Sequence, residues 1–158
     1  MKLHGSCHCG AVQFSLESNQ YYPFMRCYCS ICRKTAGGGG YAINLGGDNQ
    51  TFVVEGREHV SVYRAKMPGG ETSSGQRHFC KHCGSALWLW DPTYPDLVHP
   101  HASAIDTDLP VPPEHTHLMT DSKAAWVEVQ AVERDKCFTE YPDESLAQWH
   151  DRLGLGQS

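Results

Sequence analysis

The sequence has 158 residues, of which 40% are hydrophobic and 20% are charged, and its formal net charge is −5. This composition predicts a single folded domain over residues 1–158, and the negative charge disfavours nucleic acid as a partner, since phosphate binding requires a basic face. No apolar run approaches the roughly 20 residues of a spanning helix, and the N-terminus lacks the apolar core of a signal peptide. We therefore expect a cytoplasmic protein that does not enter a membrane.

Alternating hydrophobic and polar residues predict a mainly β fold. Residues 12–16 alternate clearly, and residues 51–55, 60–66 and 126–132 also have the character of short strands. Because strands of this length need partners, the sequence predicts small packed antiparallel sheets.

Turns, a loop and two helices complete the predicted elements. The glycines of residues 46–49 predict a chain reversal, and three prolines in residues 109–113 predict an extended surface loop, because proline fixes φ and lacks a backbone donor. A short helical turn is expected from about Ser30. A C-terminal helix is expected over about residues 143–153, with Asp143 as its N-cap.

Seven of the eight cysteines stand in three short clusters, which in a reducing compartment predicts metal binding in preference to disulfides. The first and last clusters, Cys7-His8-Cys9-Gly10 and Cys80-Lys81-His82-Cys83-Gly84, each end in glycine. Glycine tolerates the positive φ of a tight turn that would point two sulfurs at one ion. We therefore predict one structural zinc site formed by Cys7, Cys9, Cys80 and Cys83.

The middle cluster, Cys27-Tyr28-Cys29-Ser30-Ile31-Cys32, has three sulfurs and no fourth cysteine with a matching motif. Three protein ligands leave one position of zinc open, which is the arrangement of catalytic zinc sites. One of the ten histidines could instead close a structural site of three cysteines and one histidine. The eighth cysteine, Cys137, stands alone and is expected to be a partly buried side chain.

Cationic side chains are expected near both zinc sites. Seven thiolates and two Zn²⁺ ions would add −7 and +4, about −3 in total, to the charge of the chain. Arg26, Arg33 and Lys34 flank the middle cluster. Arg77 and Lys81 flank the last one, so these five residues are candidates for balancing the thiolates.

An ordered set of motifs spans most of the chain, at residues 5–14, 27–34, 77–85, His117 and residues 122–126. This set resembles the glutathione-dependent formaldehyde-activating enzyme family, which also includes centromere protein V. The resemblance implies a β-tent fold, with a structural zinc on Cys7, Cys9, Cys80 and Cys83 and a catalytic zinc on Cys27, Cys29 and Cys32. The family often has histidine between the first two cysteines of the middle motif, where this chain has Tyr28.

The resemblance also implies a carbon–sulfur lyase that adds the glutathione thiol to formaldehyde and gives S-hydroxymethylglutathione. His117, at a family position, and the residues adjacent to the triplet are candidate donors to the developing oxyanion. Gly38 and Gly39 could let the backbone of a tripeptide lie close to the chain, and Lys123 could bind its carboxylate. The expected partners are a small thiol such as glutathione and a small aldehyde, with homo-oligomerisation left open.

A non-catalytic binding module is the second interpretation of the same residues. In this interpretation both zinc ions are structural and the surface docks a protein partner. An open fourth position at the triplet favours the enzyme, whereas a protein ligand in that position favours the module.

Overall fold

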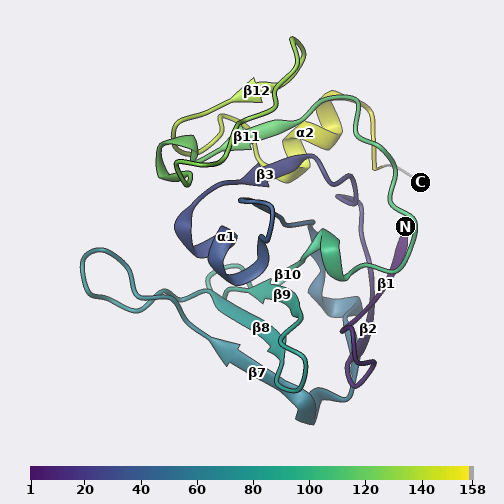
Figure 1. Ribbon diagram of the computed structural model, residues 1–158. Helices are drawn as coiled ribbons and strands as arrows, with labels where there is room; N and C mark the ends of the chain where they lie inside the picture. The colour runs from purple at the N-terminus through teal and green to yellow at the C-terminus, as the bar shows by residue number, and fades with distance from the viewer. Residues whose placement is uncertain (157–158) are drawn as a thin grey trace.

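The computed structural model describes residues 1–156, in which twelve strands form three sheets (Figure 1). The strands are β1 (Lys2–Ser6), β2 (Gln13–Glu17), β3 (Met25–Cys27), β4 (Ala42–Ile43), β5 (Gly47–Asp48), β6 (Val53–Glu55), β7 (Val60–Tyr63), β8 (Gln76–Cys80), β9 (Ala86–Trp90), β10 (Leu97–Pro100), β11 (Thr116–Leu118) and β12 (Lys136–Cys137). The two α-helices are α1 (Ser30–Ala36) and α2 (Leu146–Arg152). Four short 3-10 turns lie between strands, at η1 (Asn49–Thr51), η2 (Arg57–His59), η3 (Ala102–Ala104) and η4 (Thr120–Ser122).

The strand orders are β1–β2–β6, β5–β10–β9–β8–β7 and β12–β11–β3–β4. The first two sheets are antiparallel throughout. In the third sheet β11 runs parallel to both β3 and β12, while β3 and β4 are antiparallel. The mainly β architecture is thus confirmed, but one sheet is mixed. Parallel pairing requires a long connection, and the strands from β4 to β10 lie in the chain between β3 and β11.

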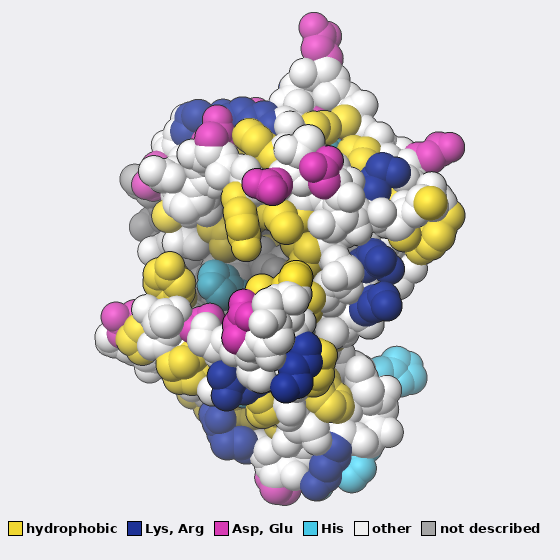
Figure 2. Space-filling view, turned by 90° about the vertical axis from the view of Figure 1, so that its left-hand side faces the viewer, with side chains coloured by type: hydrophobic (Ala, Val, Ile, Leu, Met, Phe, Trp, Pro, Cys, Tyr) yellow, Lys and Arg dark blue, Asp and Glu magenta, His cyan; other side chains and the backbone are white. Residues whose placement is uncertain are grey.

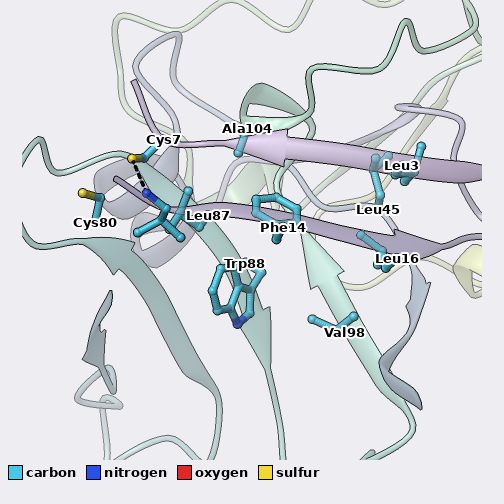
Figure 3. Packing of buried hydrophobic residues seen from close by; sticks show 11 residues of the cluster. Leu3, Cys7, Phe14, Leu16, Leu45, Cys80, Leu87, Trp88, Val98 and Ala104 are labelled. Atoms are coloured by element: carbon cyan, nitrogen blue, oxygen red, sulfur yellow. Dashed lines mark hydrogen bonds between the residues drawn. The ribbon is translucent and has the colours of Figure 1, made fainter. Parts of the chain in front are cut away.

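The main hydrophobic core lies between the first two sheets. Phe14 and Leu16 of β2 are buried, as the alternation predicted, and the ring of Phe14 meets Trp88 of β9 edge to face with centroids 5.5 Å apart. Cys7 and Cys80 lie at one end of the same core (Figure 3). The first cysteine cluster is therefore built directly against the packed interior.

Residues 46–49 do not form the predicted reversal. Gly47 pairs with β10 as part of β5, and Gly46 bridges to Gln20. A Cβ on Gly46 would lie 2.0 Å from Oε1 of Gln20, and a Cβ on Gly47 would lie 2.1 Å from Cδ1 of Leu16. These glycines allow close packing of neighbouring segments, a second use of glycine that sequence does not distinguish from a turn.

The prediction of a strand at residues 126–132 is wrong, since this segment has no regular structure. Trp126 and Val132 are 70% and 56% exposed, whereas Val127 is buried beside Gly40. Alternation produces a strand only where a neighbouring strand can pair with it and cover one face. The next strand in the chain is β12, where Cys137 is exposed and not partly buried as expected.

The other predicted elements are present with shorter bounds. The strands predicted over residues 51–55 and 60–66 are reduced to β6 and β7, and residues 109–113 form a loop without regular structure, as expected. The helices are seven residues each. Neither helix in residues 1–156 combines the length and apolar character needed to cross a membrane.

The C-terminal helix α2 begins later than predicted because Ser145, and not Asp143, is its N-cap. The Ser145 hydroxyl accepts the backbone N–H of Gln148 at 3.2 Å, and the Gln148 side chain accepts the backbone N–H of Ser145 at 2.8 Å. This reciprocal pair satisfies two donors that a helix leaves free at its start. Trp149 then stacks on Phe24 with ring centroids 3.8 Å apart and attaches α2 to the segment before β3.

Candidate metal centre and active site

Two tight turns, each ending in glycine, bring the four outer cysteines together. The sulfurs of Cys7, Cys9, Cys80 and Cys83 all lie within 4.8 Å of one another. The Sγ atoms of Cys7 and Cys9 are 3.5 Å apart, and those of Cys9 and Cys80 are 3.7 Å apart. A tetrahedral zinc with bonds of about 2.3 Å spaces its sulfurs by about 3.8 Å, so this cluster could hold such an ion with little movement.

Backbone geometry explains the glycine after each outer pair. Gly10 and Gly84 have φ values of 78° and 75°, the left-handed region that favours glycine. Their N–H groups donate to the carbonyl oxygens of Cys7 at 3.0 Å and Cys80 at 2.8 Å, which closes the two turns. The N–H of Val12 donates to Sγ of Cys7 at 3.2 Å. The turns predicted at these glycines are therefore confirmed.

The middle cluster is built where a strand meets a helix. Cys27 ends β3, Cys29 is the N-cap of α1, and Cys32 lies in the first turn of α1. The helical turn predicted from Ser30 is confirmed, and it brings Cys29 and Cys32 to the same side because they are about one turn apart. The three sulfurs lie within 4.8 Å of one another, and in residues 1–156 no His, Cys, Asp or Glu completes the group as a fourth ligand.

The three sulfurs of this triplet require a cation to carry negative charge together. Hydrogen bonds from the thiols of Cys27 and Cys32 lower the pKa of Cys29 to about 2, while hydrogen bonds with Cys29 and Cys32 raise the pKa of Cys27. Arg77 of β8 supplies one positive charge, since its Nη2 lies 3.7 Å from Sγ of Cys32. A divalent ion would stabilise the remaining thiolates, so the donor set fits a soft metal such as zinc.

The other four predicted cations have different surroundings. Arg33 and Lys34 lie in α1, while Arg26 and Lys81 contact other groups. The guanidinium of Arg26 stacks over the ring of Tyr41 at 5.1 Å, and Nζ of Lys81 donates to the carbonyl oxygen of Glu58 at 2.8 Å. Arg77 was expected beside the Cys80–Cys83 pair, but the structure places it against the triplet. One short strand therefore serves both cysteine clusters.

A pocket of about 350 Å³ adjoins the triplet, with a lining that includes Thr35 of α1, Tyr63 of β7, residues 77–79 of β8, Ala86 of β9 and His101. Arg77 lines this pocket and also contacts Cys32, and its Nη1 is 3.4 Å from Oγ1 of Thr35. The face that carries the segment between β7 and β8 is hollowed, with hydrophobic side chains around the hollow and a histidine inside it (Figure 2). The volume lies at the lower end of the range for small-molecule sites.

A buried chain of three side chains ties the triplet to β11. His117 is fully buried, and its Nε2 lies 3.4 Å from Oδ2 of Asp135. Because a carboxylate only accepts, Nε2 carries the proton, and Nδ1 accepts the Tyr28 hydroxyl at 2.9 Å. Burial raises the pKa of Asp135, but hydrogen bonds from the backbone of His115 and Val132 and from the His117 ring lower it to about 2.

Comparison with known proteins agrees with this arrangement. A family model described as glutathione-dependent formaldehyde-activating enzyme matches residues 2–122, more than half of the chain. The chain belongs to this family. A Halomonas elongata protein named "Putative glutathione-dependent formaldehyde-activating enzyme" is 64% identical over 155 residues, 98% of each chain. A crystal structure of a Rhodobacter sphaeroides protein is similar at 27% identity and a TM-score of 0.53, over 70% of this chain and 92% of that chain.

In this member of the glutathione-dependent formaldehyde-activating enzyme family, Tyr28→Phe is expected to lower the free energy of unfolding by about 1–3 kcal/mol, because His117 Nδ1 would be buried without a partner. Urea unfolding measures the change. Tyr141→Phe is the matched control, since Tyr141 is 78% exposed. Equal unfolding midpoints for the two variants would contradict an anchoring role for the Tyr28 hydroxyl.

The residues predicted to bind the thiol ligand lie apart from the pocket described above. Gly38 and Gly39 are exposed, and a Cβ on either would meet no atom within 4 Å. Nζ of Lys123 donates to the carbonyl oxygen of Val127 at 3.0 Å, and Val127 packs against Gly40. The structure thus brings the lysine and glycine segments together, and their ligand role stays a prediction.

The pocket also contains Tyr63 and His101, which lie outside every motif, beside His78 of the motif at residues 77–85. Tyr63, His78 and His101 belong to separate segments of the chain. Pairing of β7 with β8 and a bridge between Asn44 and His101 bring them to one place. Because these contacts are set by sheet register, no local pattern in the sequence marks Tyr63 or His101.

Proposed function

We propose that this chain is a zinc-dependent carbon–sulfur lyase that joins the thiol of glutathione to formaldehyde as S-hydroxymethylglutathione. The proposed structural zinc site consists of Cys7, Cys9, Cys80 and Cys83, and the proposed catalytic site of Cys27, Cys29 and Cys32. The observation that carries the proposal is a triplet of sulfurs that has no fourth His, Cys, Asp or Glu ligand within residues 1–156 and adjoins a pocket. The proposed location is the cytoplasm, where thiols stay reduced.

The triplet would hold zinc with one tetrahedral position left for a ligand. When bound there, zinc lowers the pKa of a thiol and so supplies a strong nucleophile at neutral pH. The backbone around the triplet supports a role in binding zinc, since the start of α1 positions Cys29 and Cys32 and strand β3 positions Cys27. Rigid elements of this kind keep the open position directed at one place.

Arg77 is the proposed donor to the oxygen of the aldehyde. Attack on the carbonyl carbon moves negative charge onto that oxygen, and a donor already in place stabilises it without reorganisation. A guanidinium has five N–H donors, and contacts with Cys32 and Thr35 use two of them. The remaining donors can meet the oxygen within the pocket, so Arg77 is favoured over His117, whose ring nitrogens are both engaged.

The experiment that tests this function is a rate measurement against the spontaneous reaction. Thiols and formaldehyde combine without protein, so the zinc-loaded chain must consume formaldehyde faster than the uncatalysed mixture. We expect a rate proportional to protein and saturable in glutathione, measured beside cysteine and 2-mercaptoethanol. Metal-free protein prepared with a chelator is the control, and it should show only the background rate.

The opposite result is equally clear. The lyase proposal fails if protein with two zinc ions bound does not accelerate formaldehyde consumption in the presence of any of these three thiols. The non-catalytic binding module would then be the better interpretation of the same two cysteine clusters.

A further inference from the structure

His101 is a buried histidine in the wall of the pocket that the proposed function leaves without a role, and the inference about it rests on that function. It follows β10, is the N-cap residue of η3, and is 2% exposed. It lines the same pocket as Arg77. A buried polar ring in this position needs partners for both of its nitrogen atoms.

The first nitrogen has a partner that determines the tautomer. Nδ1 of His101 lies 2.7 Å from Oδ1 of Asn44, and the two residues also form an antiparallel bridge through their backbones. An amide oxygen only accepts hydrogen bonds, so Nδ1 carries the ring proton. The other nitrogen of the neutral ring, Nε2, therefore has a free lone pair.

The second nitrogen is placed to meet a ligand. Within residues 1–156, Nε2 of His101 makes no hydrogen bond, and it is not among the fully buried side-chain atoms that lack a partner, so some of its surface is open. The ring borders a pocket of about 350 Å³, in which a ligand can supply the missing donor. Arg77 in the same lining links this pocket to Sγ of Cys32, one of the three cysteines of the proposed catalytic site.

The surroundings keep the ring uncharged. Burial, followed by the charges of Arg77 and His99, lowers the pKa of His101 to about 4. The other titratable side chains in the described lining are His78 and Tyr63, and no carboxylate is among them. At pH 7 the ring is neutral, so its lone pair is available to accept a proton.

We infer that His101 is the base that takes the thiol proton and returns it to the aldehyde oxygen. The S–H proton moves to Nε2 as the thiol binds at the triplet, and an electron pair of the resulting thiolate then forms the new bond to the carbonyl carbon. The π bond of the carbonyl breaks, and its electron pair goes to the oxygen, where Arg77 donates a hydrogen bond. The imidazolium then gives its proton to this far more basic oxygen, so no other reactant is consumed.

His101→Gln in the zinc-loaded full chain tests this role, since glutamine is polar but cannot carry the proton. We expect kcat to fall by about 100-fold, the lower end of what general acid–base catalysis contributes, while KM for glutathione changes little. His4→Gln is the matched control, because His4 is exposed on β1, and it should leave kcat unchanged. A folded His101→Gln protein with two zinc ions and a wild-type kcat would overturn the inference.

A second variant uses the partner of the ring. Asn44→Asp keeps an acceptor for Nδ1–H, and its charge favours the imidazolium form of His101. The acidic limb of the pH–rate profile should therefore move to higher pH. The other titratable and charged neighbours of the ring, Arg77, His99 and His78, are unchanged in this variant. An acidic limb at the wild-type pH would show that a different group accepts the proton.

Nitrogen-15 NMR of the histidine rings separates this inference from the lyase proposal. In wild-type protein at pH 7, Nε2 of His101 should be unprotonated, and its signal should shift when glutathione and formaldehyde are added together. A protonated Nε2, or a signal indifferent to both reagents, would overturn the role of His101 even if the protein catalyses the reaction. A wild-type rate equal to background would instead refute the lyase proposal, and this inference with it.

Discussion

Cys32→Ser is expected to remove one of two zinc ions and to reduce the thiol-dependent rate to the uncatalysed background, while the fold persists. Cys32 lies in the first turn of α1, within 4.8 Å of two other sulfurs. Loss of an outer-shell partner alone weakens metal binding by about 10–100-fold, so loss of a direct sulfur ligand should weaken it further. Metal analysis and the formaldehyde assay measure the two effects.

The control for this variant is Cys137→Ser, which changes an exposed thiol outside both clusters. It should retain two zinc ions and the full rate. Far-UV circular dichroism with a thermal melt shows whether the Cys32→Ser chain is folded. A folded variant that keeps two zinc ions and the wild-type rate would contradict the assignment of the catalytic site to the triplet.

Cys80→Ser is expected to have the largest effect on stability, leaving most of the chain unfolded. Cys80 is fully buried at the end of β8, and its cluster joins this strand to the segment after β1. Structural zinc supplies about 10–16 kcal/mol in zinc-finger peptides, which is comparable to the roughly 5–15 kcal/mol that stabilises a typical domain. The loss of this ion therefore removes a large part of the free energy of unfolding, and a serine hydroxyl in the fully buried position of Cys80 removes more.

Urea unfolding followed by tryptophan fluorescence measures this effect. Cys83→Ser is the informative comparison, because Cys83 belongs to the same cluster but is exposed. It should lose the same zinc ion without disturbing the packed core, and so unfold at a lower urea concentration than wild type but a higher one than Cys80→Ser. A Cys80→Ser midpoint equal to that of Cys137→Ser would show that the cluster does not stabilise the fold.

Much of the cysteine arrangement could be predicted because its geometry is local. Cys29 and Cys32 are about one helical turn apart, so their convergence follows from the short helix predicted at Ser30. Gly10 and Gly84 follow their cysteine pairs, and their positive φ values are a property of the turn itself. The prediction that Cys7 and Cys9 form one site with Cys80 and Cys83 follows from the pattern that the two pairs share, and it requires no knowledge of how the strands pair.

Other features depend on contacts between distant segments. Residues 126–132 alternate like a strand but lack a neighbouring strand, and the glycines at 46 and 47 serve close packing. Asp143 was a reasonable N-cap from its type, but Ser145 has the reciprocal partner Gln148. These errors share one cause, since propensity describes what a segment can form and its surroundings select among the possibilities.

Three features could be predicted from the residues alone: the mainly β class, the division of seven cysteines into a group of four and a group of three, and the resemblance to a known family. Each of these depends on residue type and short-range spacing. Three other features became visible only in the folded chain: Arg77 contacts Cys32, His117 is buried behind Tyr28, and His101 lines the pocket. The physical reason is that strand pairing and sheet packing place these side chains, and the register of distant strands is not encoded in any local pattern.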